Sequence, residues 1–321
     1  MRVTSNSVVR DLVANLQQTY RRMDVLQSQL ATGARVQRPS DDPTATRESM
    51  NLRSVLTAND RYQRNADDGL AWSQATDAAF DQLSQILLRA KELSLSAANS
   101  PLPDQSRQAI YDEARELLNQ AIQVGNSSHG TRFIFNGFNA SSPNKPFSLS
   151  TGTDPITGAA VTTVNGPSDA GQYLTREVAD GVRVDVSTPG SSLQPVIQKL
   201  ADMVDVLGRV ATSPTTNPPP PAPQYGADLA SLSSTFPAAL ETSLDQVLSL
   251  RADNGARMSR LETTQSQLLA SQVNLEGLLS KTEDTDVVQA VMDLQMAQTA
   301  HQTTLAVGAR IIPQTLVDFL R

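Results

Sequence analysis

The sequence contains no cysteine, only two histidines and few aromatic residues. Without cysteine the chain can form neither a disulfide bond nor a thiolate metal site. His129 and His301 alone are too few for a zinc site built on several histidines. Aromatic residues make up only 4% of the 321 residues, which favours narrow helical bundles with aliphatic seams over one large core.

The chain also lacks basic clusters and long apolar runs. Its net charge is −7 and its pI is about 4.9, whereas nucleic-acid binding needs clustered Lys and Arg. Arg21, Arg22, Arg35 and Arg38 come nearest to a basic stripe, and they are typical of a solvated helix face. No run approaches the roughly 18 apolar residues of a membrane span, and residues 1–12 lack the apolar segment of a cleavable signal. We expect no nucleic-acid partner, no membrane contact and no cleaved leader.

No motif in the sequence predicts an enzyme. A nucleophile elbow, a dinucleotide fingerprint and a phosphate-binding loop are all missing. Adjacent acids such as Asp41-Asp42 and Asp67-Asp68 fit helix capping or solvated charge better than acid–base catalysis. His301 lies on a helical seam, where a single polar residue sets the register of packed helices. We therefore expect no catalytic residue, no cofactor and no metal.

Two seams of apolar residues, spaced three and four apart, lie near opposite ends of the chain, and each predicts helix-to-helix packing. The first consists of Val9, Leu12, Leu16, Thr19, Met23, Leu26 and Leu30. It stops at Gly33, a suitable C-cap. The second consists of Val287, Val291, Leu294, Gln298, His301, Leu305, Gly308, Ile312, Thr315 and Phe319. Asp286 and Gln289 resemble a capping box at its start, and Pro313 should kink or end the helix.

Between the seams the pattern predicts more helix around a β-rich centre. Asp42-Pro43 is a strong helix start, and a seam continues from Leu52 to Ala90. A second helix, with Ile110, Ala114, Leu117, Ala121 and Val124 on one stripe and its end near Gly125, can pair with the first as an antiparallel hairpin. Turn residues punctuate 136–190, with strands expected at 133–135, 161–164 and 182–186. A short helix with Val196, Leu200, Met203 and Leu207 follows. A proline-rich segment around 214–223 comes next, and helix returns near Ala227.

The fold class we predict is mainly α with a β-rich insert. The N- and C-terminal parts form a long antiparallel helical bundle or coiled coil, and a small β domain lies at its tip. The predicted domains are terminal helices at 1–42 and 283–321, a helical rod at 43–138 and 227–282, and a variable insert at 139–226. We expect removal of about 140–224, with a short linker across the gap, to leave export and assembly largely working. Spacing alone leaves open an ordinary helical bundle within one monomer.

The terminal helices are expected to be disordered in the isolated monomer. Burying six apolar positions of the first seam is worth roughly 9–18 kcal/mol. Ordering its 22 backbone residues costs roughly 22–44 kcal/mol, and isolated helices of this length are marginal in water. Packing against several neighbours would tip the balance towards folding.

Two long strings of residues resemble a known family. Residues 30–43, Leu-Ala-Thr-Gly-Ala-Arg-Val-Gln-Arg-Pro-Ser-Asp-Asp-Pro, are similar to the N-terminal signature of bacterial flagellins and their relatives. Residues 244–262, which include Arg251-Ala-Asp-Asn-Gly-Ala-Arg257, are similar to the C-terminal signature. Within that superfamily, the opening Met1-Arg-Val-Thr-Ser-Asn6, the run Phe133-Ile-Phe-Asn-Gly137 and the ending 309–320 resemble the hook–filament junction proteins.

The resemblance implies a non-catalytic structural protein of the bacterial flagellum, exported unfolded and assembled outside the cell. Its partners would be further copies in a ring, an adjacent hook-associated protein, flagellin and an export chaperone. The assembly interface would include Leu12, Leu16, Met23, Leu26, Leu30, Val291, Leu294, Leu305, Ile312 and Phe319. The alternative is a minor flagellin that forms the filament itself. An enzyme seated in the insert is a third class, which the lack of a clustered His/Glu motif over 136–223 disfavours.

Overall fold

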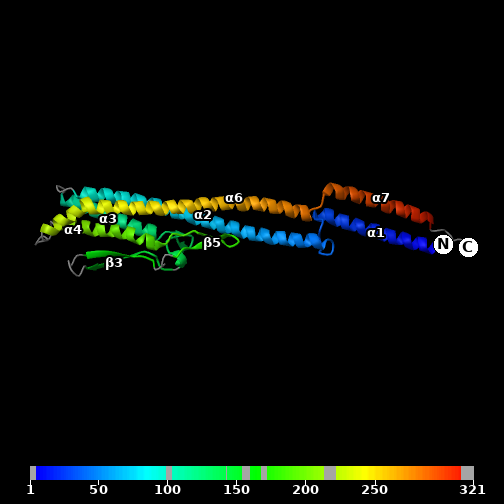
Figure 1. The fold of residues 1–321 in the computed structure, drawn as a ribbon, viewed down its shortest axis with the longest axis horizontal. Coiled ribbons are helices and arrows are strands. Elements are labelled where there is room, and N and C mark those ends of the chain that lie inside the picture. The colour runs from blue at the N-terminus through cyan, green and yellow to red at the C-terminus, as the bar shows by residue number, and fades with distance from the viewer. Residues whose placement is uncertain are drawn as a thin grey trace. The chain divides into compact units, whose positions relative to one another are not determined.

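The computed structural model describes residues 5–98, 103–141, 143–153, 160–167, 172–212 and 222–311. The chain forms two compact units (Figure 1). Unit 1 comprises residues 1–59 and 270–321, and unit 2 comprises residues 60–269. Two long helices, α2 (Pro43–Ala97) and α6 (Phe236–Glu283), contribute to both units. Two predictions fall outside the described residues: the proline-rich segment with its four prolines at 218–221, and the kink or helix end at Pro313.

Unit 1 contains helices α1 (Ser5–Thr32) and α7 (Val287–Ile311), together with the start of α2 and the end of α6. Its helix ends are set by local chemistry. Gly33 has a φ of 72° and ends α1, as predicted, because a residue without Cβ adopts this conformation without strain. Asp286 accepts a hydrogen bond from the backbone N–H of Gln289 at the start of α7. The Gln289 side chain instead donates to Asp293, so only half of the predicted capping box forms.

The start of α2 follows the prediction for Asp42-Pro43. The Asp42 Oδ1 accepts hydrogen bonds from the backbone N–H groups of Thr44 and Ala45, at 3.1 and 3.0 Å. These N–H groups have no partner within the helix, so the carboxylate satisfies them. The hydrogen bond from Ala45, with smaller contributions from Arg35 and Thr44, lowers the pKa of Asp42 from its ordinary value.

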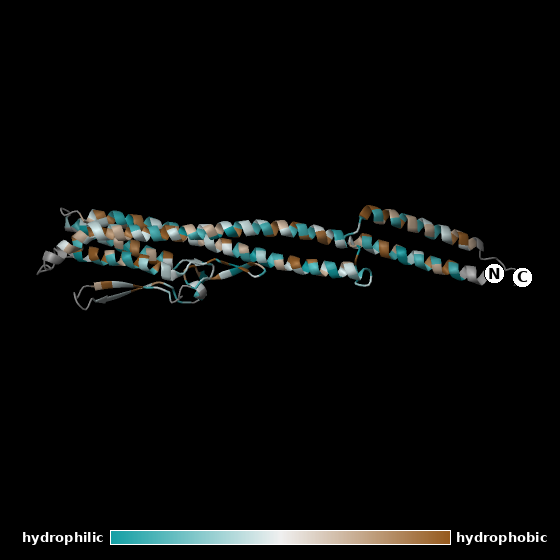
Figure 2. Cartoon of the chain, viewed as in Figure 1, coloured by the Kyte–Doolittle hydropathy of each residue, from teal (hydrophilic) through white to brown (hydrophobic). Residues whose placement is uncertain are grey.

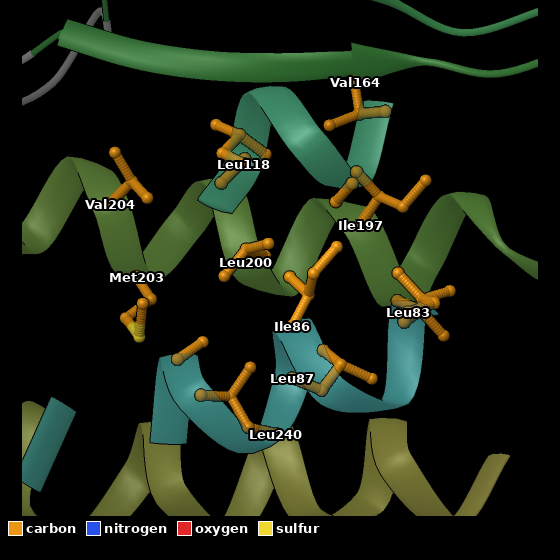
Figure 3. Close-up of a cluster of buried hydrophobic side chains, with 14 of the residues drawn as sticks. Leu83, Ile86, Leu87, Leu118, Val164, Ile197, Leu200, Met203, Val204 and Leu240 are labelled. Atoms are coloured by element: carbon orange, nitrogen blue, oxygen red, sulfur yellow. The ribbon is translucent and has the colours of Figure 1, made fainter. Parts of the chain in front are cut away.

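Unit 2 is organised around one apolar core shared by helices. It contains most of α2, α3 (Asp104–Gly125), α4 (Gln194–Thr212) and the beginning of α6. Figure 3 shows Leu83 and Leu87 of α2 with Leu200 of α4 and Leu240 of α6 in this core. A short helix, α5 (Ala222–Ala230), joins α6 through a wide π turn at Ser231–Thr235. The seam predicted along α2 is confirmed between Asn59 and Ala90, where most of its members are buried.

Helix α4 is part of this core rather than a detachable element of the insert. Ten apolar residues of α4 are buried, among them Val196, Ile197, Leu200, Met203 and Leu207. Helices α3 and α4 pack side by side (Figure 1). Removal of 140–224 would therefore strip a helix from the core and expose its apolar partners to water. The expectation that export and assembly survive this removal rested on an insert that merely joins the helices, and the place of α4 in the core contradicts that premise.

The strands form three separate antiparallel hairpins. They are β1 (Ser128–His129) with β2 (Arg132–Phe133), β3 (Ser148–Thr153) with β4 (Ala160–Asn165), and β5 (Thr175–Ala179) with β6 (Val182–Asp185). Short 3-10 turns occur at Gly137–Asn139 and Gly190–Ser192. Ile134 and Phe135, which were predicted to continue a strand, are instead buried in the core just after β2.

The hairpin of β3 and β4 is attached to α4 by side chains that bind its backbone. The Asp205 carboxylate accepts from the backbone N–H and the hydroxyl of Thr162. Gln198 accepts from the N–H of Val164 at 2.7 Å and donates to the carbonyl of Thr162 at 2.9 Å. Gln194 donates to the carbonyl of Val164 at 3.0 Å. Polar side chains of a helix thus satisfy one edge of the hairpin, as a neighbouring strand would.

The hairpin of β5 and β6 rests on α2 and α6 in a smaller apolar cluster. Val178, Val184 and Val186 are buried there with Ala66 and Leu261. A Cβ at position 69 of α2 would lie 2.9 Å from Val186 Cγ1, so glycine permits this close approach.

The predicted class, mainly α with small antiparallel strands in an insert, is confirmed. Along the described chain, no helix is long and apolar enough to cross a membrane.

Candidate assembly interface

Helices α1 and α7 form an antiparallel pair in unit 1. Three contacts fix their direction. Gly308 lies against Leu12, the ring centroids of His301 and Tyr20 are 6.5 Å apart, and the N–H of Thr285 donates to the carbonyl of Gly33. The residues of α1 predicted for the interface lie along this seam. Leu26 is buried, whereas Leu12, Leu16, Met23 and Leu30 are half-buried.

On α7 the seam contains some of the predicted positions and leaves others exposed. The residues buried or half-buried against α1 are Ala290, Leu294, Ala297, His301, Thr304 and Gly308. Leu294, His301 and Gly308 of the predicted seam are among them, whereas Val291 and Leu305 are 39% and 50% exposed. Ile312 and Phe319 lie outside the described residues. Gly308 of α7 lies against Leu12 of α1, and Ala290 and Ala297 are also buried, although a pattern of large apolar residues does not select them.

The α7 face turned away from α1 carries exposed apolar side chains that the sequence reading missed. Val288, Met292, Met296 and Val307 are each at least 45% exposed, and α7 contains many hydrophobic residues in Figure 2. Met292 and Met296 line a shallow groove of about 820 Å³. Exposed apolar stripes of this kind mark protein contacts.

The N-terminal signature forms the turn that holds both ends of the chain together in unit 1. The Arg35 N–H donates to the carbonyl of Glu283 at 2.6 Å, and its guanidinium donates to the carbonyl of Thr282 at 2.9 Å. The Arg35 guanidinium also lies 3.5 Å from the Asp42 carboxylate. Glu283 forms an ion pair with Arg53 at 2.7 Å. The signature residues therefore act by positioning α1 and α7, and no chemical step is required of them.

The C-terminal signature lies on α6 in unit 2 and binds α2. Arg251 donates to Asp77 and Asp81, each at 2.8 Å, and these hydrogen bonds raise its pKa above the ordinary value, with Asp77 the larger cause. Asn254 is buried and donates to the carbonyl of Ser73 at 2.8 Å. These polar contacts lie along an apolar seam, so they hold α2 and α6 in one register.

The two histidines have no catalytic environment in the described chain. The His129 ring lies edge-on to the buried Trp72, with centroids 6.1 Å apart. His301 is half-buried in the α1–α7 seam. Within the residues that the structure describes, no three His, Asp or Glu side chains gather as a metal site would require.

Known protein families match the two ends of the chain, where the two signatures lie. Residues 3–140 match the bacterial flagellin N-terminal helical region, and residues 238–320 match the bacterial flagellin C-terminal helical region. The flagellar filament 30.7 kDa core protein of Treponema maltophilum is 25% identical over 289 residues, covering 88% of this chain and 85% of that protein.

Solved structures share the fold. The FlgL structure of Bacillus cereus superposes with a TM-score of 0.54 at 21% identity, covering 72% of this chain and 99% of that one. The flagellar junction protein FlgL of Legionella pneumophila superposes with a TM-score of 0.53 at 14% identity, covering 75% of this chain and all of that one. Because flagellin family models match about two thirds of its length at the two ends, the chain belongs to the bacterial flagellin family.

Proposed function

We propose that this protein is a structural component of the bacterial flagellum that forms an adaptor ring between hook and filament. The observation that carries the proposal is the α1–α7 pair, which joins the two ends of the chain and leaves an apolar stripe of α7 exposed. Val291, Met292, Met296 and Leu305 are all exposed there. A stripe of this kind requires neighbouring protein in water.

The partners follow from this role. Further copies and adjacent flagellar proteins would cover the exposed face of α7, including Val291 and Leu305. An export chaperone would bind the same apolar residues before assembly, which would prevent premature association inside the cell. The assembled protein would lie outside the cell at the hook–filament junction and act without catalysis.

A minor flagellin that forms the filament remains the second candidate. The matched Treponema maltophilum protein is a filament core protein, which favours this reading. The opening Met1-Arg-Val-Thr-Ser-Asn6 resembles junction proteins instead, and FlgL structures share the fold over nearly their whole length. We place the junction role first on these two grounds.

Electron microscopy of flagella from a deletion strain tests the proposal. The adaptor role predicts hooks without filaments, with monomeric flagellin shed into the medium. Complementation with the intact gene should restore filaments. A deletion strain with normal filaments, or purified protein that polymerises without limit into filaments, would instead support a minor flagellin.

A further inference from the structure

The hairpin of β3 and β4 has one satisfied edge and one open edge. Side chains of α4 bind the backbone of Thr162 and Val164 on β4. Antiparallel strands alternate the direction of their backbone groups. Leu149 and Thr151, which are paired with Val164 and Thr162, therefore point their N–H and C=O groups away from β4, as does Thr153.

This open edge lacks the usual protection. All six residues of β3 are exposed, and Ser148–Thr153 contains no charge and no proline. Natural edge strands are normally blunted by Lys, Pro, a bulge or a covering element. An exposed, neutral, regular edge indicates a strand that acquires a partner.

A second surface of unit 2 is complementary to such an edge. A groove of about 640 Å³ lies between α2 and α3 and ends at the turn after α3. Two glutamines from each helix line it, namely Gln82, Gln85, Gln120 and Gln123. Ile86, Leu117 and Val124 supply its apolar surface, and no lining residue is charged. Gln85 donates to Asp81 at 2.8 Å, which leaves its carbonyl oxygen as an acceptor.

Elsewhere in the molecule, glutamine side chains of a helix bind the backbone of a strand. Gln194 and Gln198 of α4, one helical turn apart, both bind the backbone of β4: Gln194 donates to it, and Gln198 uses both the donor and the acceptor of its amide. The α2–α3 groove presents pairs of glutamines at comparable helical spacing, with no strand bound to them. Ser127 Oγ, which also borders the groove, is buried without a hydrogen-bond partner.

We propose that the open edge of β3 in one copy binds the glutamine-lined groove of the next copy. Both surfaces are uncharged, so neither repels the other, and the strand's backbone groups match the amides in donors and acceptors. The two surfaces lie on different elements, so the contact is heterologous, and repeated contacts close into a ring when the rotation permits. The inference rests on the proposed ring and names one contact within it.

Cysteine cross-linking tests the contact in assembled flagella, since the natural chain has no cysteine. The double variant Thr151→Cys/Gln120→Cys should give a ladder of covalent multimers on oxidation. The matched control replaces Gln120→Cys with Gln74→Cys, an exposed glutamine of α2 outside the groove, and should stay monomeric. A dimer formed by Thr151→Cys alone, an intrachain bond, or a ladder equally strong in the control would overturn the inference.

Proline provides a second test. Thr151→Pro removes an N–H that the hairpin itself does not use, so the fold should persist while strand binding is blocked. We expect junction-bound protein to fall roughly tenfold or more, with an unchanged circular dichroism spectrum and melting temperature. If Thr151→Pro assembles normally, the β3 contact is refuted although the ring role stands. If the unmodified protein is absent from purified hook–filament junctions, the proposed function itself fails.

Discussion

Gly308 of α7 faces Leu12 of α1 so closely that a Cβ at position 308 would lie 2.7 Å from the Leu12 Cδ2. This contact lets the two terminal helices approach at one end of their seam. Two other buried residues of α7, Ala290 and Ala297, are also small. The pair is therefore held by complementary sizes, and this relationship can be tested.

Gly308→Leu should separate α1 from α7, because a larger side chain meets Leu12 at once. Overpacking of this kind costs typically about 1–3 kcal/mol. The double variant Leu12→Ala/Gly308→Leu exchanges the sizes and should restore part of the loss. Swimming motility and the number of filaments per cell measure the effect. Failure of the exchange to improve on Gly308→Leu would argue that the two residues do not meet in the assembled protein.

Leu305→Asp should abolish incorporation into flagella and leave the monomer's thermal stability unchanged. Leu305 is 50% exposed and lies outside the α1–α7 seam, so the monomer loses little on substitution, whereas a buried charge in an assembled contact is costly. Gln74→Asp, at an exposed position of α2 in unit 2 and away from α7 in the sequence, serves as the control. Normal assembly of Leu305→Asp would remove this residue from the interface.

Leu200→Ala should destabilise unit 2 by about 2–5 kcal/mol, the range for cavity formation in a core. Leu200 is fully buried among helices α2, α3 and α6. Urea denaturation followed by circular dichroism measures the change in free energy of unfolding. Lys199→Ala, an exposed neighbour on the same helix, should change it by less than about 0.5 kcal/mol. Equal effects of the two variants would contradict the placement of α4 in the core.

The start of α2 should depend on pH through Asp42. Its folded pKa lies below the ordinary value of 3.8, so its contribution is complete above about pH 4. That contribution is lost as the pH falls through the lower, folded pKa. Amide exchange of Thr44 and Ala45 should accelerate in that acidic window. Asp42→Asn keeps a capping oxygen but cannot titrate, so its exchange should show no such step. An identical pH profile in both proteins would exclude Asp42 as the cause.

Both terminal helices should exchange rapidly in the isolated monomer and become protected on assembly. Hydrogen exchange followed by mass spectrometry should show residues 1–35 and 287–321 exchanging as fast as unfolded peptide. Residues 45–120 and 230–280 should be protected. The physical reason is that α1 buries a single stripe, with Leu26 alone fully buried among its predicted interface residues, which does not offset the ordering entropy. Strong protection of both ends in a verified monomer would refute the idea.

Much of the helical architecture could be predicted from the sequence because its signals are local. The seam of α2, the cap at Asp42 and the stop at Gly33 each depend on residues within one or two turns. The residues of α7 that pack against α1 could be predicted only in part. Val291 and Leu305 are more hydrophobic than Ala290 and Ala297, so a hydrophobic pattern selects the larger residues, whereas packing against α1 selects the smaller ones.

Long-range packing explains the other differences. Helix α4 follows a turn-rich stretch, and nothing nearby in the sequence shows that it completes the core of α2, α3 and α6. The amides of Gln194 and Gln198 carry no periodic signal, so their hold on β4 became visible only in three dimensions. The glutamine-lined groove, formed by residues from two helices, escaped notice for the same reason.

The hydrogen bond between Arg35 and Thr282 joins residues 247 positions apart. We expect unit 1 to form after unit 2, because the two ends of so long a loop meet more readily once the residues between them have folded. Unit 2 lies between its two halves and can fold first, as a scaffold that brings α1 and α7 within reach of each other. The order of folding is thereby built into the chain's connectivity, with the association-competent end completed last.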